Sequence, residues 1–538
     1  MEEKKNKSFI QGAAILAAAV VVCKALGAVY KIPLYNWLGS AGTTTFTVTY
    51  NVYSLLLTIS TAGIPIALSR LVSAAIARGR TKQVARYYKV AMPAFIVIGV
   101  VCMLIMLIFA KQFAKFMGVA EIEPGIRVLA PAVFFSCVVA IYRGYTQGFE
   151  DMMPTAVSQV IEVVFKILVG LTVVFIFMKR GYGVATLSAG AITGAVVGMG
   201  LTIPAMIWCK KKTDNRLRLM PCEDEYMDSP SDTLKELMKV SIPITASILI
   251  LNVVLLINTK VIIARLQTGS GFSYDEALDL EGVRSMAMTF FNLPNAFIVP
   301  VTTSVVPAIS AALAVNKHKN ARNVMESALK LNNLFAMPAG FGMAVLANPI
   351  FNGFFWGNNQ LGVKMLFVLG FASYFICLQL ITTAILQASG FERLSLYTLP
   401  AGCILQVVIV YILVGIPKIG IMGATIGTTS CYVIISAINM FIMKRRLECP
   451  PRYIRTFLKP MICTVIMGAA AWAVYGLSTK LLSGMAATRI GTLVLLVVAV
   501  IIAVVIYAVL VIVTGAISRS DLQFIPKGEK IADLLKIK

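Results

Sequence analysis

Residues 492–513, TLVLLVVAVIIAVVIYAVLVIV, decide the fold class. This segment holds no charge, and it is long enough to cross a bilayer as a helix, which takes about 20 apolar residues. Predominantly apolar windows recur at 13–22, 94–109 and 163–178. Of 538 residues, 58% are hydrophobic and 13% charged, against roughly a quarter charged in soluble domains. The chain is therefore predicted to be an all-α polytopic membrane protein.

Long apolar windows separated by Gly, Pro and charge clusters predict about 14 transmembrane helices. They are expected near residues 9–38, 43–69, 87–112, 126–147, 153–178, 183–209, 236–264, 282–313, 327–356, 362–389, 395–415, 420–443, 454–478 and 489–515. When alternate loops are assigned to opposite sides, most Lys and Arg fall on the side of the N-terminus. Because positive loops stay inside, both termini are expected in the cytoplasm.

The composition excludes several function classes. Lys and Arg number 48 against 24 Asp and Glu, but they gather in short loops between spans and are not interleaved with aromatic residues that could stack on bases. We therefore expect membrane lipids, and no nucleic acid, as partners. Ten Cys without a C-x-x-C pair, and His318 as the one His, argue against disulfides, metal sites and cofactors.

The chain carries a weak internal duplication. Residues 73–75 (SAA) recur at 310–312, and residues 91–94 (AMPA) recur at 336–339. Six spans repeated in one orientation predict two pseudo-symmetric six-helix lobes, followed by two C-terminal helices. Parallel repeats of this kind are typical of secondary transporters, which work by alternating access between lobes.

This duplication sets the expected domain boundaries. They are an N-terminal lobe at 1–209, a cytoplasmic linker at 210–235, a C-terminal lobe at 236–446, the last two helices at 447–515 and a cytoplasmic tail at 516–538. No extramembrane segment is large enough for a soluble catalytic or nucleotide-binding module.

Several basic residues fall inside the predicted spans. A charge at the centre of a membrane helix costs about 2.5–3.5 kcal/mol on insertion scales, so it usually faces a wet cavity or a partner. Lys24 and Lys31 are two helical turns apart and share one face of the first span. The repeat places Lys260 close to Lys31. Snorkelling to the interface is the alternative for Lys31 and Lys260.

The fifth span carries a polar stripe. Gln159, Glu162 and Lys166 lie at i, i+3 and i+7, and Glu162 could pair with Lys166 within the helix. That pair could equally serve helix packing. Because Glu162 is the one acid deep in a span, the interior is net positive and suits an anionic ligand such as a phosphate or pyrophosphate.

Three arginines near span ends complete the candidates. Arg70 and Arg143 lie at cytoplasmic helix ends, where they could also anchor lipid headgroups. Arg284 begins the eighth span beside the acidic outer loop 275–281, where a salt bridge is the alternative.

Residues 142–148 (YRGYTQG), 153–156 (MPTA) and the stripe that follows resemble a signature of one transporter family. This is the family of polysaccharide-biosynthesis flippases related to stage V sporulation protein B and the Gram-positive lipid II flippase. Residues 24–27 (KALG) are similar to a motif in its first helix. The resemblance covers nearly the whole chain.

The resemblance implies the fold of the multidrug/oligosaccharidyl-lipid/polysaccharide exporter superfamily, with two extra helices that help form a lipid-facing groove. It implies a monomeric flippase of the bacterial plasma membrane rather than an enzyme, with no catalytic residue. Its partner would be an undecaprenyl-pyrophosphate-linked saccharide, above all the peptidoglycan precursor lipid II. By motif, Lys24, Arg143, Glu162 and Lys166 carry over. The expected cavity set is Lys24, Lys31, Arg70, Arg143, Gln159, Glu162, Lys166, Lys260 and Arg284.

The charges and loop lengths bear on two alternative functions. A drug/cation antiporter of the same superfamily would typically have twelve spans and would need membrane acids, of which this chain has Glu162 alone deep in a span. A membrane glycosyltransferase or ligase would need acids or His in a sizeable outer loop, and the expected outer loops are short.

Overall fold

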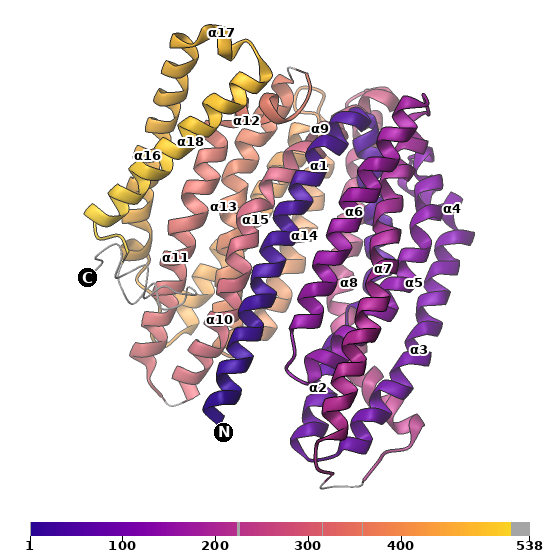
Figure 1. Cartoon of the computed structure of the whole chain (residues 1–538). Coiled ribbons are helices and arrows are strands. Elements are labelled where there is room, and N and C mark those ends of the chain that lie inside the picture. The colour runs from indigo at the N-terminus through magenta and orange to yellow at the C-terminus, as the bar shows by residue number, and fades with distance from the viewer. Residues whose placement is uncertain (1, 223–225, 315, 358, 518–538) are drawn as a thin grey trace. The chain divides into compact units, whose positions relative to one another are not determined.

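The computed structural model describes residues 2–222, 226–314, 316–357 and 359–517, and within these ranges all regular elements are helices (Figure 1). They are α1 (Glu2–Thr61), α2 (Ile64–Ala77), α3 (Thr81–Ile108), α4 (Ala110–Met117), η1 (Ala120–Ile122), α5 (Glu123–Gly148), α6 (Met153–Lys179), α7 (Val184–Arg218), α8 (Pro230–Thr268), α9 (Tyr274–Phe291), α10 (Leu293–Ala314), α11 (His318–Val345), α12 (Ala347–Phe354), α13 (Gln360–Ala388), α14 (Glu392–Val414), α15 (Met422–Arg446), α16 (Tyr453–Leu481), α17 (Ser483–Ala486) and α18 (Arg489–Val513). The predicted tail at 516–538 lies outside the described residues beyond position 517.

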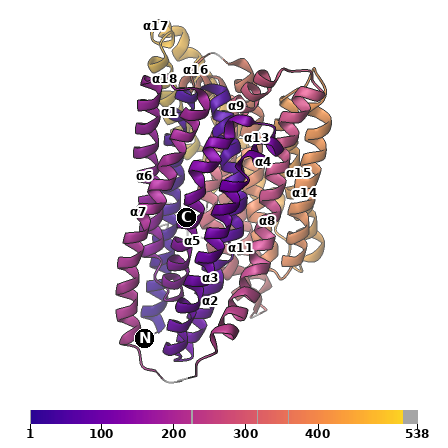
Figure 2. The same ribbon diagram turned by 90° about the vertical axis from the view of Figure 1, so that its right-hand side faces the viewer.

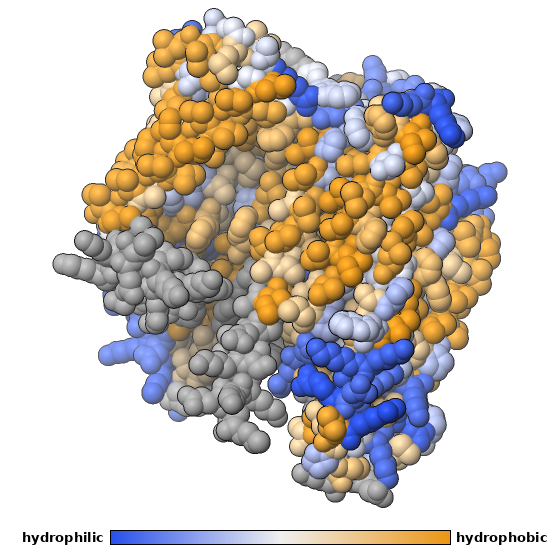
Figure 3. All heavy atoms as spheres, viewed as in Figure 1, coloured by the Kyte–Doolittle hydropathy of each residue, from blue (hydrophilic) through white to orange (hydrophobic). Residues whose placement is uncertain are grey.

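The all-α polytopic membrane fold is confirmed. Eleven helices in the described part of the chain are long and apolar enough to cross a membrane, or twelve if α11 and α12, bent by 73° at their junction, form one span. The stretch Ala18–Ala77 counts once in that number although Gly39, at φ 70° and ψ −176°, divides α1. The space-filling view shows apolar residues covering the flanks of the helices (Figure 3).

The predicted second span, 43–69, is broken rather than continuous. The chain leaves the helix between α1 and α2, where a Cβ on Gly63 would lie 2.3 Å from the carbonyl oxygen of Ser241. Pro65 follows in the first turn of α2, a position where proline fits a helix start. The close approach of α8 at this glycine is the tertiary reason for the break.

Three further predicted spans, 87–112, 282–313 and 327–356, are also divided. The interruptions fall at Phe109, Asn292 and Leu346. Phe109 and Leu346 are apolar, so the apolar windows of the sequence continue across them without a visible break. The short helices α4 and α12 follow two of the breaks.

The described chain forms two compact units. Unit 1 contains the residues up to Ala264 together with Tyr274–Gly282, and unit 2 contains Arg265–Ser273 together with the residues from Val283 onward. The boundary between units therefore falls inside α8 and inside α9. The linker predicted at 210–235 rests on the sequence repeat and not on the boundary between the compact units. It stays a prediction.

Polar contacts explain why most of α8 belongs to unit 1. Gln83 of α3 is 2% exposed, and its amide contacts Asp228 twice, donating to Oδ2 at 3.0 Å and accepting from the backbone N–H at 2.9 Å. Near the middle of α8, the Ser54 hydroxyl of α1 donates to Asn252 Oδ1 at 2.8 Å. In an apolar medium such bonds hold helices together, because the alternative is an unsatisfied polar group.

The duplication is visible in the order and length of the helices. In unit 1 α3 has 28 residues and α4 has 8, and in unit 2 α11 has 28 and α12 has 8. The repeated residues 73–75 and 310–312 lie in corresponding helices of the two units, α2 and α10. Residues 91–94 do not keep the same position, because they begin at the eleventh residue of α3 whereas 336–339 begin at the nineteenth of α11. That tetrapeptide is not equivalent in the two helices.

In unit 2, α16 and α18 pack beside the junction of α11 and α12. A cluster of buried apolar side chains joins them, formed by Leu346, Met467, Ala471, Leu496 and Ala503. Figure 1 shows the two helices connected by α17. These are the predicted C-terminal helices.

Helices α6 and α7 of unit 1 meet through glycines, and Figures 1 and 2 show them side by side. Gly190, Gly194 and Gly198 lie one turn apart on α7. A Cβ on Gly194 would lie 2.4 Å from the carbonyl oxygen of Lys166, and one on Gly198 would lie 2.5 Å from that of Glu162. Small residues at such spacing let two membrane helices touch backbone to backbone. This contact fixes the position of the polar stripe of α6 along the helix axis relative to α7.

We expect Gly194→Ala to destabilise the protein by about 1–3 kcal/mol, the usual cost of overpacking. The matched control is Gly200→Ala on the same helix, where the new methyl group meets Phe135 at 3.6 Å, an ordinary contact. Thermal unfolding of the purified protein in detergent, followed by size-exclusion chromatography, measures both. Equal midpoints for the two variants would show that α6 and α7 are not in close contact.

Candidate functional site

The candidate site is built on the turn that joins α5 to α6. Two glycines near the end of α5 let α2 pack closely, since a Cβ on Gly144 would lie 2.7 Å from Pro65 Cα and one on Gly148 2.5 Å from Val72 Cγ1. Across the turn, Gln147 Nε2 donates to Thr155 Oγ1 at 3.0 Å. The hydrogen bond between Gln147 and Thr155 ties the first turn of α6 to the last turn of α5.

Arg143 reaches from α5 to two residues on α6. Its Nε donates to Ser158 Oγ at 2.8 Å, and its Nη2 lies 3.3 Å from Glu162 Oε2. Ser158 in turn donates to the carbonyl oxygen of Thr155 at 2.7 Å. The side chains of Arg143 and Glu162 are 19% and 24% exposed. The guanidinium is thus held in a defined orientation, and its planar fork keeps further donors for an anion.

Lys166 lies one turn further along α6, against tyrosine rings of α1. Its Nζ is 4.6 Å from the ring centroid of Tyr50 and 5.7 Å from that of Tyr30. The Tyr30 hydroxyl donates to the carbonyl oxygen of Ala191 at 3.1 Å, which anchors that ring to α7. An ammonium over aromatic faces is attracted by the ring quadrupoles.

The predicted pairing of Glu162 with Lys166 is wrong. Among the described residues Glu162 makes its ion pair with Arg143, while Lys166 contacts the rings of Tyr30 and Tyr50. Spacing along one helix identifies which side chains could meet, but it does not account for a competing cation on a neighbouring helix.

Several buried polar atoms near this cluster have no hydrogen-bond partner among the described residues. They include the Tyr50 hydroxyl, Thr47 Oγ1 and Gln159 Oε1. Buried polar atoms in native proteins are usually bonded to protein, water or ligand. A donor group on a ligand could therefore be accepted here, beside the positive charge of Lys166.

The contacts described above do not include the other basic residues predicted for the site. Lys24 is exposed and Lys31 half-buried on α1, and Arg70 is exposed on α2. Lys260 of α8 lies with its Nζ 3.8 Å from the ring centroid of Phe116, a residue of α4. Arg284 of α9 is 8% exposed and belongs to unit 2.

The structure thus brings together Arg143, Glu162 and Lys166, and it adds Tyr30 and Tyr50, which the sequence reading missed. A weak signal for the missed residues exists in the pattern Phe46, Tyr50 and Tyr53, which places three aromatic rings along one side of a helix. Among the described residues, no cluster of His, Cys, Asp or Glu could hold a metal ion.

Comparison with known proteins gives a family match over residues 9–313, to the family described as polysaccharide biosynthesis protein. Three similar curated proteins come from Bacillus subtilis (strain 168). The uncharacterized membrane protein YabM is 28% identical, covering 81% of this chain and 80% of YabM. Stage V sporulation protein B is 24% identical, with coverages of 86% and 89%, and the lipid II flippase MurJ is 25% identical, with coverages of 82% and 83%.

Solved structures share the fold. The lipid II flippase MurJ in an inward closed conformation has a TM-score of 0.65 at 14% identity, covering 93% of this chain and 99% of that one. An inward-facing multidrug resistance transporter of the MATE family, in the MOP superfamily, has a TM-score of 0.65 at 16% identity, with coverages of 81% and 98%. At these identities the likeness concerns the fold alone.

We expect that exchanging the charges of the ion pair, with Arg143→Glu and Glu162→Arg together, restores part of the stability that either single reversal removes. Residues in direct contact typically couple by about 0.5–3 kcal/mol. The measurement is the thermal midpoint of the purified protein, with membrane abundance as a second readout.

The matched control exchanges Glu162 with Lys166, by Glu162→Lys and Lys166→Glu together. We expect no such restoration there, because Lys166 lies over Tyr50 instead. Restoration in the control but not in the Arg143 pair would contradict the geometry described above.

Proposed function

Because the chain belongs to the polysaccharide biosynthesis protein family, we propose that it is a membrane flippase for undecaprenyl-pyrophosphate-linked saccharides. The substrate that we favour is lipid II, the peptidoglycan precursor. The saccharide headgroup crosses from the inner to the outer leaflet by alternating access, while the polyprenyl tail stays in lipid. We place both termini in the cytoplasm and the protein in the bacterial plasma membrane.

The observation that carries this proposal is the charge of the cluster on α5 and α6. Arg143 and Lys166 face one acid, Glu162, whose carboxylate pairs with Arg143, while the Lys166 ammonium lies over aromatic rings. Two basic groups against one acid give the cluster a positive formal charge inside a membrane-spanning bundle, where electrostatic interactions are stronger than in water. A pyrophosphate is the complementary ligand, since Arg supplies a fork of donors and Lys a point charge.

The predicted roles of the other basic residues belong to the same proposal. Lys24, on the exposed part of α1, would meet the pyrophosphate first, and Arg143 and Lys166 would follow. Lys31, Arg70, Lys260 and Arg284 would contribute positive potential along the path. Gln159, with its buried Oε1, would accept a hydrogen bond from a sugar hydroxyl.

The second candidate is a drug/cation antiporter, because the chain shares its fold with the MATE transporter. A cation carrier exposes carboxylates to its substrate. Here Glu162 is paired with Arg143, which lowers its value as a cation site. The two functions make opposite demands on Lys166, because a cationic substrate would be repelled by it.

The test is complementation in a bacterium whose own lipid II flippase can be switched off. We expect this chain to restore growth and outer-leaflet lipid II, and Lys24→Ala to lower the lipid II transport rate by about ten- to a hundredfold, as for loss of one charge-assisted contact. Lys179→Ala is the matched control, because Lys179 lies in the last turn of α6 over the ring of Phe175.

Rescue that survives Lys24→Ala at equal membrane abundance would remove Lys24 from the substrate path. Failure of the unaltered chain to rescue, despite good membrane abundance, would contradict lipid II as the substrate. Resistance to a cationic drug in that same strain would favour the antiporter.

A further inference from the structure

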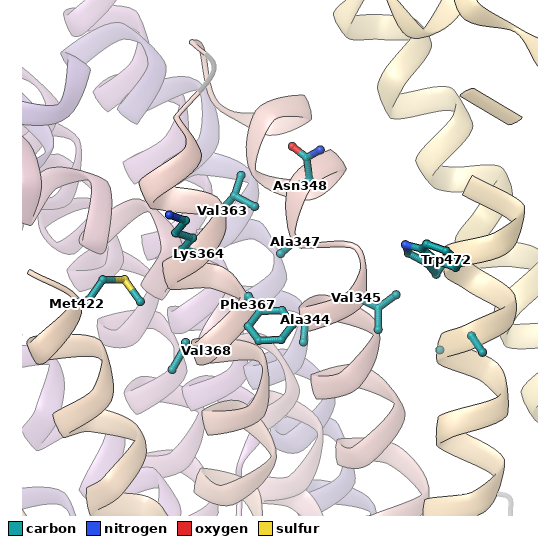
Figure 4. Close-up of a pocket in the computed structure, with 12 residues that line it drawn as sticks. Ala344, Val345, Ala347, Asn348, Val363, Lys364, Phe367, Val368, Met422 and Trp472 are labelled. Atoms are coloured by element: carbon teal, nitrogen blue, oxygen red, sulfur yellow. The ribbon is translucent and has the colours of Figure 1, made fainter. Parts of the chain in front are cut away.

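Unit 2 contains an apolar groove where α16 faces the junction of α11 and α12 and the first turns of α13 (Figure 4). Its volume is about 780 Å³, within the usual range of ligand pockets, about 300–1,000 Å³. In Figure 4, Trp472 of α16 lies across the groove from Lys364 and Phe367 of α13. The lining residues are Ala344, Val345, Ala347, Asn348, Val363, Lys364, Phe367, Val368, Met422, Gly468, Ala469 and Trp472.

The groove has an apolar wall and two polar residues. Phe367 and Trp472 keep 48% and 70% of their surface exposed, and among the lining residues Asn348 and Lys364 alone are polar. Both α13 and α16 are long and apolar enough to span the membrane. Hydrocarbon chains are therefore the molecules that reach this wall.

The internal duplication shows what is special about Lys364. In unit 1, α5 begins with Glu123, and Arg127, its fifth residue, pairs with that acid at 2.7 Å. In unit 2, α13 begins with Gln360, and its fifth residue is Lys364. The cation is kept while the acid is replaced by a neutral amide of similar size. Among the described residues Lys364 makes no ion pair.

The equivalent place in unit 1 has a different character. A hollow of about 470 Å³ there is lined by Glu121, Glu123 and Arg127 together with small residues. Its lining has two carboxylates and one guanidinium, so its formal charge is negative, and it contains no large apolar side chain. The apolar wall with an unpaired cation is thus confined to the unit that carries the C-terminal helices.

Helix α18 holds α16, and with it one side of the groove, in place. Arg489, the first residue of α18, donates from Nε to the carbonyl oxygen of Gly353 at 2.8 Å and from Nη2 to that of Phe354 at 2.5 Å. These carbonyls end α12, where helical acceptors otherwise lack partners. Since α18 packs on α16, this contact fixes the far side of the groove relative to α12.

We propose that this groove is a binding site for an anionic phospholipid of the surrounding membrane. The headgroup phosphate pairs with Lys364, the amide of Asn348 lies beside the headgroup, and one acyl chain lies between Phe367 and Trp472. Such a lipid is bound, not transported. The site is independent of the proposed flippase activity.

The probe is the fluorescence of Trp472 in a variant with Trp37, Trp208 and Trp356 replaced by Phe. The protein is placed in nanodiscs of unlabelled phosphatidylcholine that contain increasing fractions of phosphatidylglycerol or phosphatidylcholine with brominated acyl chains, which quench nearby tryptophan. We expect brominated phosphatidylglycerol to reach half-maximal quenching at about fivefold lower fraction, as for one lysine near an anionic lipid.

Two substitutions test the headgroup contact. Lys364→Ala removes the cation, and Gln360→Glu restores the acid found in unit 1 without changing side-chain size, so both should abolish the preference for phosphatidylglycerol. Arg127→Ala in unit 1 is the matched control and should keep it. Equal quenching by the two lipids in the parent, or a preference that survives Lys364→Ala, would overturn the proposal.

A third substitution tests the groove itself. Gly468→Leu fills it, since a Cβ there meets Val345 Cγ2 at 3.5 Å and leaves the rest of the side chain to project into the space. Quenching of Trp472 should fall, and unchanged quenching would place the lipid outside the groove. Displacement of brominated phosphatidylglycerol by equimolar undecaprenyl pyrophosphate would assign the groove to the transported lipid and overturn the proposal.

Discussion

The exclusion of water from the membrane interior is the constraint on which this structure depends. Each peptide group must be bonded within its own segment, so the described elements are helices. The same constraint governs the side chains. Arg143 can lie within the bundle because Ser158 and Glu162 satisfy it, and Lys166 because aromatic rings surround it. Where α6 and α7 pack backbone to backbone, the contact residues of α7 are glycines, because a larger side chain would collide with α6.

Much of the fold could be predicted from the sequence because apolar length is a strong signal. Residues 492–513 all lie in α18, and the predicted gap after position 38 coincides with the kink at Gly39. The breaks at Phe109 and Leu346 could not be predicted, since both residues are as apolar as their neighbours. Burial does not single them out either, because Leu346 is 3% exposed and Phe109 46% exposed.

The candidate site was predicted in part for a related reason. Helical spacing grouped Gln159, Glu162 and Lys166 correctly on one helix. It assigned the wrong partner to Glu162, because the position of Arg143 depends on the turn between α5 and α6 and on the contact with Ser158. The contact between Lys166 and Tyr50 joins positions far apart in the chain. A contact between positions so far apart leaves no trace in the local pattern of one sequence.

The path of the chain between units has a mechanical consequence. One passage lies within α8, between Ala264 and Arg265, and another within α9, between Gly282 and Val283. A helix resists twisting and bending far more than a flexible linker does. At these two passages the units are therefore joined by helical backbone, which is stiffer than a loop.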